Sequence, residues 1–293
     1  MRNDFLIKFL NEYPMAILPS KLAQIEAFLQ FRLAGGPRVE FQAQQAPAYQ
    51  VYGAVAVLPV FGSILPRADA CMEMSGGTSL DRAGARFRQA IEDPAVGSIV
   101  LDVDSPGGSV YGVQEFAQEV YAARGRKKVV AVADHLAASA AYWIASAAEQ
   151  FFVSPSGEVG SIGVVAMHVD YSENLKTEGI KVTYVHAGEH KVEGNQAEPL
   201  GDDAKAFIQQ RVDEYYEAFV GAVARNRGVT RAKVLKDFGQ GRVYGADQAK
   251  AVGMVDRVAP LQEVIRGLQP RTRTNRAAAS AEADIAAAVL KAS

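Results

Sequence analysis

Cysteine is almost absent from this sequence, with Cys71 as the single one among 293 residues. One cysteine cannot form a disulfide within the chain and argues against a structural zinc site, so we expect a reducing compartment. No glycine-rich phosphate-binding loop or adenine-binding motif is visible either. The sequence therefore predicts a protein that works without a metal or another cofactor.

An excess of charge of either sign is also lacking. The chain has 31 Lys and Arg against 33 Asp and Glu, a formal net charge of −2, which does not indicate binding to nucleic acid or to an anionic membrane surface. The uncharged, mostly apolar run at residues 51–66 contains glycine and proline and is shorter than the roughly 20 apolar residues that span a bilayer. Charged residues also interrupt residues 1–14, which lack the apolar core of a secretory signal. We expect a cytoplasmic protein with no signal peptide and no transmembrane helix.

The sequence does contain enough apolar material for a large core, because 49% of its residues are hydrophobic and 22% are charged. Short β-rich runs alternate with helical patterns, which predicts one α/β domain at 50–268. An N-terminal helical appendage with its connector (1–49) precedes it, and a basic linker with an Ala-rich tail (269–293) follows. The expected strands are 54–61, 98–103, 128–133, 150–153, 160–165 and 182–186. The expected helices are 20–33 capped by Ser20, one opened by a Thr78–Asp81 capping box, 111–123, 172–177, 202–225 capped by Asp202, and 231–237.

One stretch, D-H-L-A-A-S-A-A-Y-W-I-A-S-A at 134–147, places Ser139 between the buried strand expected at 128–133 and a segment with helical spacing. The N-terminus of a helix offers free backbone N–H groups and a dipole that favours negative charge. Ser139 is therefore a candidate nucleophile. The alternative is a helix N-cap with no catalytic role.

A second stretch, D-S-P-G-G at 104–108, follows the strand expected at 98–103. It places Gly107 and Gly108 at the carboxyl edge of the sheet, where open α/β sheets bind ligands. Glycine lets a backbone N–H approach a substrate oxygen closely. A plain Pro-Gly turn is the alternative.

A third stretch, A-G-E-H-K-V-E-G-N at 187–195, holds Lys191 in a polar loop. A serine attacks only when a base removes its proton, and a lysine can be that base only if burial lowers the lysine pKa. Taken alone, this loop favours a solvated surface lysine.

Together with G-S-I-G-V at 160–164, these stretches resemble, in order and spacing, the signal peptide peptidase A family of serine proteases. The resemblance covers roughly residues 52–260. It implies a Ser-Lys dyad on a fold of the Clp protease and crotonase type. The matched residues are Ser139 as nucleophile, Lys191 as general base, Ser161 as the hydroxyl that orients the lysine, and Gly107, Gly108 and Ala140 as the oxyanion-hole region.

Within that family the likeness is closer to head-maturation proteases of tailed phages and prophages. It rests on A-I-L-P-S-K-L at 16–22, M-S-G-G-T-S at 74–79, D-V-D-S-P-G-G at 102–108 and K-V-E-G-N-x-x-x-P-L at 191–200. The resemblance implies a protein substrate, namely scaffold, portal or the chain's own tail, and work in the host cytoplasm or inside a procapsid. Some such proteases carry a C-terminal scaffold segment, although the tail here is short for one.

The resemblance also implies a ring-like homo-oligomer in which the serine and the lysine of one site can come from neighbouring subunits. We expect the peptide to bind as an added strand between the backbone after Gly108 and residues 160–165. The expected substrate-binding residues are Ser109, Gly160, Ile162 and Gly163. One departure is that Ala140 and Ala141 stand where the family usually has two glycines, which predicts a narrow site that favours small side chains beside the scissile bond.

Four alternatives stay open. His168 and Asp170 could complete a Ser-His-Asp triad, because the H-V-D spacing puts both on one face of a strand. A crotonase-type acyl-CoA enzyme would share the fold but would leave Ser139 and Lys191 unexplained. The chain could also be a cytosolic protease of the signal-peptide-peptidase type, or an inactive assembly subunit.

Overall fold

The computed structural model describes residues 14–24, 27, 49–67 and 77–269. Its centre is a mostly parallel sheet with the strand order β2-β3-β6-β8-β10-β11, so the expected α/β class is confirmed. The central strands are rich in valine, leucine and alanine and are almost fully buried, as suits parallel strands covered on both faces. The strands of this path are β2 (Gln50–Tyr52), β3 (Val55–Phe61), β6 (Ser98–Ser105), β8 (Lys128–Ala138), β10 (Glu158–Gly160) and β11 (Val243–Gly245).

Strand β8 divides the sheet into two branches. Its residues 130–133 pair with β9 (Gln150–Val153), and its last residues, 136–138, pair with β10. On its other edge, β9 pairs with β12 (Arg257–Val258). Because β8 continues past the expected end at residue 133, it leads directly to Ser139 at the start of the next helix.

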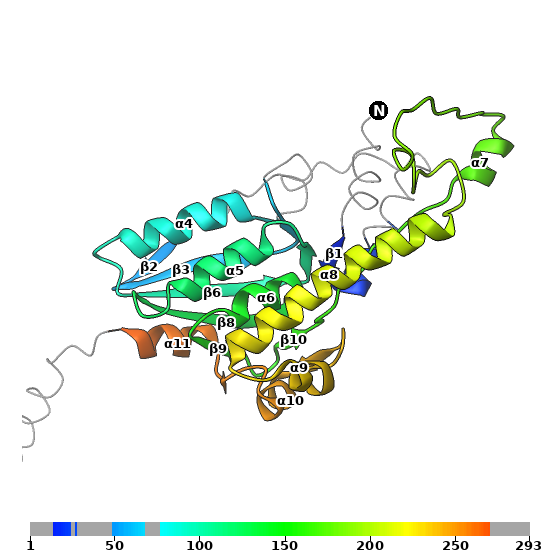
Figure 1. Ribbon diagram of the computed structural model, residues 1–293. Coiled ribbons are helices and arrows are strands. Elements are labelled where there is room, and N and C mark those ends of the chain that lie inside the picture. Colours follow the sequence, from blue (N-terminus) through cyan, green and yellow to red (C-terminus); the bar gives the residue numbers. More distant parts are fainter. Residues whose placement is uncertain (1–13, 25–26, 28–48, 68–76, 270–293) are drawn as a thin grey trace, which may run out of the picture.

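Helices cover the two faces of the sheet (Figure 1). On one face, α4 (Leu80–Glu92), α5 (Val113–Ala122) and α6 (Ala140–Ser146) bury the larger hydrophobic core. The opposite face is covered by α11 (Leu261–Leu268), whose Val264 and Ile265 pack on valines of β3, β6 and β8. The sequence analysis did not anticipate α11.

A second sheet, with the strand order β1-β7-β4-β5, continues from the carboxyl end of β6. Its strands are β1 (Met15–Ile17), β7 (Gly107–Ser109), β4 (Ile64–Leu65) and β5 (Thr78–Ser79). The D-S-P-G-G stretch is therefore extended chain, because β6 runs through Ser105 and β7 begins directly after Pro106.

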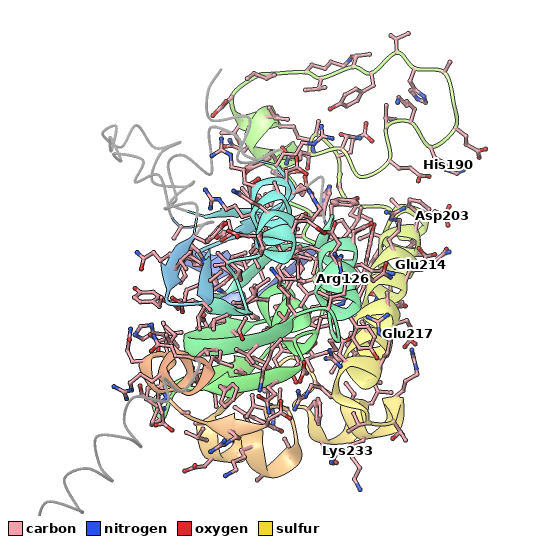
Figure 2. All side chains as sticks on the ribbon, turned by 90° about the vertical axis from the view of Figure 1, so that its left-hand side faces the viewer. Arg126, His190, Asp203, Glu214, Glu217 and Lys233 are labelled. Carbon is pink, nitrogen blue, oxygen red and sulfur yellow. The ribbon has the colours of Figure 1, made fainter. Side chains whose placement is uncertain are left out.

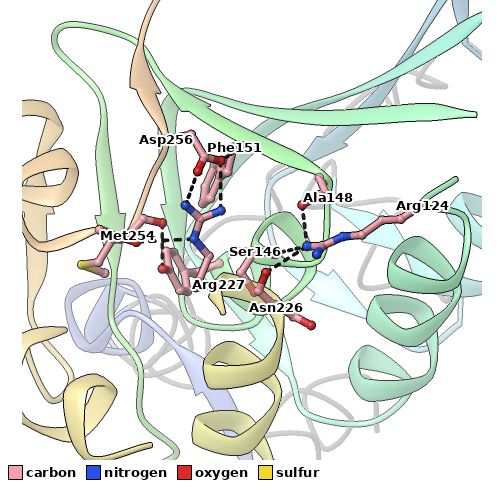
Figure 3. Close-up of polar contacts among 10 residues, drawn as sticks. Arg124, Ser146, Ala148, Phe151, Asn226, Arg227, Met254 and Asp256 are labelled. Carbon is pink, nitrogen blue, oxygen red and sulfur yellow. Dashed lines mark hydrogen bonds and ion pairs between the residues drawn. The ribbon is translucent and has the colours of Figure 1, made fainter. Parts of the chain in front are cut away.

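The long helix α8 (Asp202–Arg227) lies beside α6, and residues at its C-terminal end form hydrogen bonds with the body (Figure 3). Arg124 donates hydrogen bonds to the carbonyls of Ala148 (2.6 Å) and Asn226 (3.1 Å), so it satisfies carbonyls that follow α6 and end α8. Arg227 donates two hydrogen bonds to the carboxylate of Asp256, at 3.0 and 2.7 Å. Helices α9 (Arg231–Asp237) and α10 (Ala246–Val252) follow.

Residues 166–201, which we call the arm, extend from the body near the N-terminal end of α8 (Figure 1). The arm contains the short helix α7 (Ser172–Thr177), which matches the expected bounds. The strand expected at 182–186 is wrong, because these residues are exposed and form no strand. The strand expected at 160–165 is also wrong in its extent, because β10 ends at Gly160 and only Val165 makes a further bridge.

Three expected helix starts are corrected. Ser79, rather than Thr78, caps α4, because the Thr78 hydroxyl instead bonds the backbone of Phe61. Gly201 is the N-cap of α8, and Asp202 is its first residue. The N-terminal helix includes residues 19–24 and 27, so it begins just before Ser20, and the rest of its expected range lies outside the described residues. The connector ending at residue 48 and the segment from 270 onward also lie outside them.

Candidate active site

Ser139 occupies the strand-to-helix turn that the sequence predicts. It follows the last residue of β8 directly and is the N-cap of α6, and its side chain is fully buried. Its backbone has φ 56° and ψ −118°, a conformation that a residue with a β-carbon rarely adopts. Such strain persists only where the surrounding structure imposes it, and it is concentrated at functional sites. The turn therefore holds the Ser139 hydroxyl in a fixed position.

The surroundings of Ser139 come from β10 and the segment that follows it. The Ser139 N–H donates to the carbonyl of Gly160 (2.7 Å), and its hydroxyl lies 3.4 Å from the carbonyl of Gly163. Ile162, between them, is buried. The structure therefore brings Gly160, Ile162 and Gly163 close to Ser139. Their role in binding a substrate stays a prediction.

Gly107 lies against Ser139 with φ +94°. A β-carbon at this position would lie 2.9 Å from the Ser139 β-carbon and 3.0 Å from the carbonyl oxygen of Ala138. A β-carbon at Gly108 would lie 2.0 Å from the carbonyl oxygen of Ile64. Neither position accepts a side chain. Gly107 allows the close approach of β7 to Ser139, and Gly108 allows the close approach of β7 to β4.

The candidate oxyanion donors differ in their present contacts. The Gly107 N–H donates to the Ser105 hydroxyl (3.2 Å), which in turn donates to the carbonyl of Gly62 (2.6 Å). Gly108 is paired with Ala16 of β1. Ala140 is the first residue of α6, where backbone N–H groups have no partner within the helix. Gly107 and Gly108 are thus both engaged by other parts of the chain, whereas the N–H of Ala140 has no partner within its own helix.

Ser161 is also held in a strained, buried turn. Its φ is 54°, and its N–H donates to the carbonyl of Arg242 (2.7 Å), which precedes β11. Ser109 is buried in β7, and its hydroxyl accepts from the Tyr111 N–H (3.2 Å). The structure gathers these serines around the same end of the two sheets as Ser139.

Lys191 lies away from these serines. It is exposed in the arm, and its backbone N–H donates to Gly188 within the loop. The adjacent His190 lies at the outer side of the arm, facing the end of α8 that carries Asp203 (Figure 2). In contrast, α6 contacts α8 at Phe219, which stacks on Trp143 with ring centroids 4.6 Å apart. Roughly 24 Å of helix rise separates Asp203 from Phe219. A single chain therefore does not join Lys191 to Ser139.

His168 and Asp170, the residues of the alternative triad, make other contacts. The His168 ring lies 3.0 Å from the carbonyl oxygen of Asn195, and Asp170 accepts from the Ser172 N–H (2.8 Å) at the start of α7. The hydrogen bonds from Ser172, the backbone one first, hold the pKa of Asp170 below its usual value. Both residues serve the local structure of the arm.

The sequence analysis missed strand β1. This strand pairs with β7 and also bridges Val165, so it lies among the residues just described. Three residues are too few to show an alternating pattern, and the A-I-L-P-S-K-L motif gave the one available signal.

A model of peptidase family S49 matches residues 122–273, about half of the chain. The chain therefore belongs to peptidase family S49. This range includes Ser139, Ser161 and Lys191.

Two curated phage proteins are similar over most of this chain. Capsid assembly protease C of Escherichia phage lambda is 34% identical over 253 residues, which is 85% of this chain and 56% of the phage protein. Head-tail preconnector protein GP5 of Enterobacteria phage P21 is 32% identical over 257 residues, 88% of this chain and 49% of the phage protein. Protease 4 of Salmonella typhi is 30% identical over 73% of this chain and 34% of its own length. The chain spans about half the length of the phage relatives it matches.

Solved structures of similar fold include a ClpP1 mutant from Listeria monocytogenes, with a TM-score of 0.45, 13% identity, and coverage of 71% of this chain and 94% of that one. A membrane-bound stomatin-specific protease has a TM-score of 0.46 at 16% identity and covers 73% of this chain. Among the described residues, no helix of this chain is both long and apolar enough to cross a membrane.

Proposed function

We propose that the chain is a serine endopeptidase that uses Ser139 as nucleophile and Lys191 as general base. The observation that carries the proposal is the strained, buried turn that holds Ser139 between Gly107 and Gly163. Ser139 would attack the scissile carbonyl, while the N–H groups of Gly108 and Ala140 would stabilise the oxyanion. Ser161 would orient the lysine amine.

We further propose that Lys191 reaches Ser139 from a neighbouring subunit. A lysine acts as a base only where burial disfavours its charged form, and the exposed arm of one chain does not supply that burial. The arm and the start of α8 expose large apolar side chains, which mark an interaction surface. These side chains are Ile180, Val182, Tyr184, Val185 and Phe207. A ring of subunits would cover them and bring the lysine out of water.

The phage relatives are named for capsid assembly and for the head-tail connection. We therefore propose that the substrates are procapsid proteins, namely scaffold, portal or the chain's own tail, cleaved in the host cytoplasm or inside the procapsid. This assignment depends on sequence similarity, whereas the nucleophile assignment also depends on geometry.

The test is mass spectrometry of substrate cleavage by the full chain, with a co-expressed scaffold or portal candidate. Ser139→Ala and Lys191→Ala should each abolish cleavage, and mixing the two inactive chains should restore part of it, because a mixed ring contains intact sites. Lys181→Ala, also in the exposed arm, is the matched control and should cleave normally.

Each other result has a definite meaning. Cleavage that survives in Lys191→Ala would move the base elsewhere, with His168→Ala as the next variant. Mixtures that never regain activity would refute sharing between subunits. An assembled wild-type chain that never cleaves would favour an inactive assembly subunit.

A further inference from the structure

Strand β1 is held on both edges by backbone pairing. On one edge it runs antiparallel to β7, with Met15 opposite Ser109 and Ala16 opposite Gly108. On the other edge, Met15 and Val165 exchange two backbone hydrogen bonds of 2.8 and 2.9 Å. A segment in this position has the main-chain contacts of an extended peptide added to a sheet edge.

These two edges are the ones proposed above to hold the substrate. The backbone from Gly108 onward lies on one side, and Val165, within residues 160–165, lies on the other. A peptide substrate could not form the same hydrogen bonds while β1 remains, because each N–H and carbonyl of the two edges pairs with one strand at a time. The N-terminal strand and the substrate therefore compete for one position.

Strand β1 also presents a particular peptide bond to the nucleophile. The point where a Gly107 β-carbon would lie is 2.2 Å from the carbonyl oxygen of Ala16 and 2.9 Å from the β-carbon of Ser139. Among the carbonyl groups of β1, that of Ala16 therefore lies beside Ser139. Ala16 is also directly opposite Gly108, the proposed oxyanion donor. Ala16 is completely buried, so this position admits only a small side chain.

We propose that β1 is a built-in occupant of the substrate position, which blocks the cleft until the N-terminal segment is displaced. This inference rests on the proposed function, because it takes the groove beside Ser139 as the substrate site. The same geometry defines the substrate class: an extended peptide with alanine or a residue of similar size at the position whose carbonyl faces Ser139.

The test measures peptide binding in chains that cannot cleave. Ser139→Ala is the background, and the probe is a fluorescent peptide with the sequence Y-P-M-A-I-L-P-S-K, residues 13–21. Ala16→Arg in the full chain should expel β1, because its buried site has no room for arginine, and should tighten binding about tenfold or more by freeing the cleft. Ser20→Arg, on an exposed residue of the following helix, is the control and should bind as weakly as the background.

The peptide itself supplies a second control. A probe with tryptophan in place of its alanine should not bind the Ala16→Arg chain, because the buried position is too small. Equal binding to the Ala16→Arg chain and the background, or equal binding of both probes, would overturn the proposal.

A reversible lock keeps the test decisive if Ala16→Arg does not fold. Met15 and Ser109 are directly opposite, so Met15→Cys with Ser109→Cys, in a Cys71→Ser chain, should form a disulfide. The reduced chain should bind the probe measurably better than the oxidised chain. Failure of the disulfide to form, or equal binding in both states, would refute the position of β1.

Activity separates the two proposals. If Ala16→Arg binds the probe but an assembled chain that carries Ala16→Arg and retains Ser139 and Lys191 never cleaves it, the blocking strand is supported and the peptidase proposal fails. If the chain cleaves scaffold and Ala16→Arg changes neither binding nor rate, the peptidase proposal stands and the blocking strand is wrong.

Discussion

The two halves of the proposed site are built in opposite ways. Ser139 is fully buried where the two sheets meet the start of α6, with its N–H bonded to Gly160 and its hydroxyl near Gly163. Lys191 is exposed in an arm where Val185 is 97% exposed. The body fixes the position of Ser139, whereas the surroundings of Lys191 depend on what the arm contacts. If the two residues act together as proposed, activity should appear only after assembly.

Helix α8 shows the same contrast along its length. Near its C-terminal end, Phe219 and Val220 are fully buried and Arg227 is paired with Asp256. Near its N-terminal end, Phe207 is 57% exposed. Large apolar side chains thus occur at both ends of α8, and a single chain leaves Phe207 uncovered. The exposed part is therefore available to a second copy.

The largest expected effect separates these two ends of α8. Trp143→Ala removes a side chain stacked on Phe219 and should lower the free energy of unfolding by about 3–5 kcal/mol, as for other large-to-small core changes. Phe207→Ala, at the other end, should change it by less than about 0.5 kcal/mol at low protein concentration. Urea denaturation measures both. A large loss of stability in dilute Phe207→Ala would contradict the view that a single chain leaves the N-terminal end of α8 uncovered.

The next effect concerns a buried carboxyl group in the body. Asp102 of β6 is largely buried, and its Oδ1 atom is the only buried side-chain nitrogen or oxygen in the described ranges that lacks a hydrogen-bond partner. Burial, and then the nearby Asp134 and Asp104, raise the pKa of Asp102 to about 7, against a smaller opposing effect of His135. Between about pH 4 and pH 7, the folded state therefore holds a proton on Asp102 that the unfolded state has already released.

The bound proton stabilises the folded state. Its contribution to the free energy of unfolding is fully present below about pH 4 and is lost as the pH rises through about 7. Asp102→Asn removes the titration, so the variant should match wild type near pH 4 and exceed it at pH 8 by on the order of 2–4 kcal/mol. Denaturation curves at both pH values provide the measurement. Asp81→Asn, at an exposed carboxylate, is the control and should show no such divergence. A constant difference across the pH range would contradict the raised pKa.

A smaller effect tests the strain at the nucleophile. Ser139→Gly and Ser139→Ala both remove the hydroxyl, but only glycine adopts φ 56° and ψ −118° readily. The glycine variant should therefore be more stable than the alanine variant by about 1 kcal/mol. Thermal unfolding of the two inactive proteins measures this difference. An alanine variant that is equally stable would mean that the turn stores no strain.

The contrast between body and arm also explains how far the sequence could be interpreted. The strand before Ser139, the short helix after it and the glycines at 107 and 108 were predictable, because buried strands and tight backbone approaches restrict local composition. The strand expected at 182–186 was wrong for the complementary reason. Its residues have β-forming side chains, but no strand in the described part of the chain pairs with them.

Long-range pairing was beyond the sequence analysis. Strand β1 is three residues long and gains its place from partners at β7 and Val165, far away in the chain. The assignments of Ser139 and Lys191 came from spacing and family resemblance. Neither could show that one chain leaves the two residues apart, because that depends on how the arm leaves the body.

The smallest expected effect is in the arm, next to Lys191. The His190 ring forms a short hydrogen bond with Glu193, and this bond, followed by the charge of Glu193, raises the pKa of His190 above its usual value. Glu193→Gln should return that pKa toward the usual value, as followed by NMR titration of the ring, and should leave the stability of the body unchanged. His186, exposed in the same arm, serves as the internal reference for the ring signals. Because subunit contact would change the surroundings of this loop, the wild-type titration should also shift on assembly if the arm enters a neighbour's active site. An identical titration in dilute and assembled protein would place the arm outside that site.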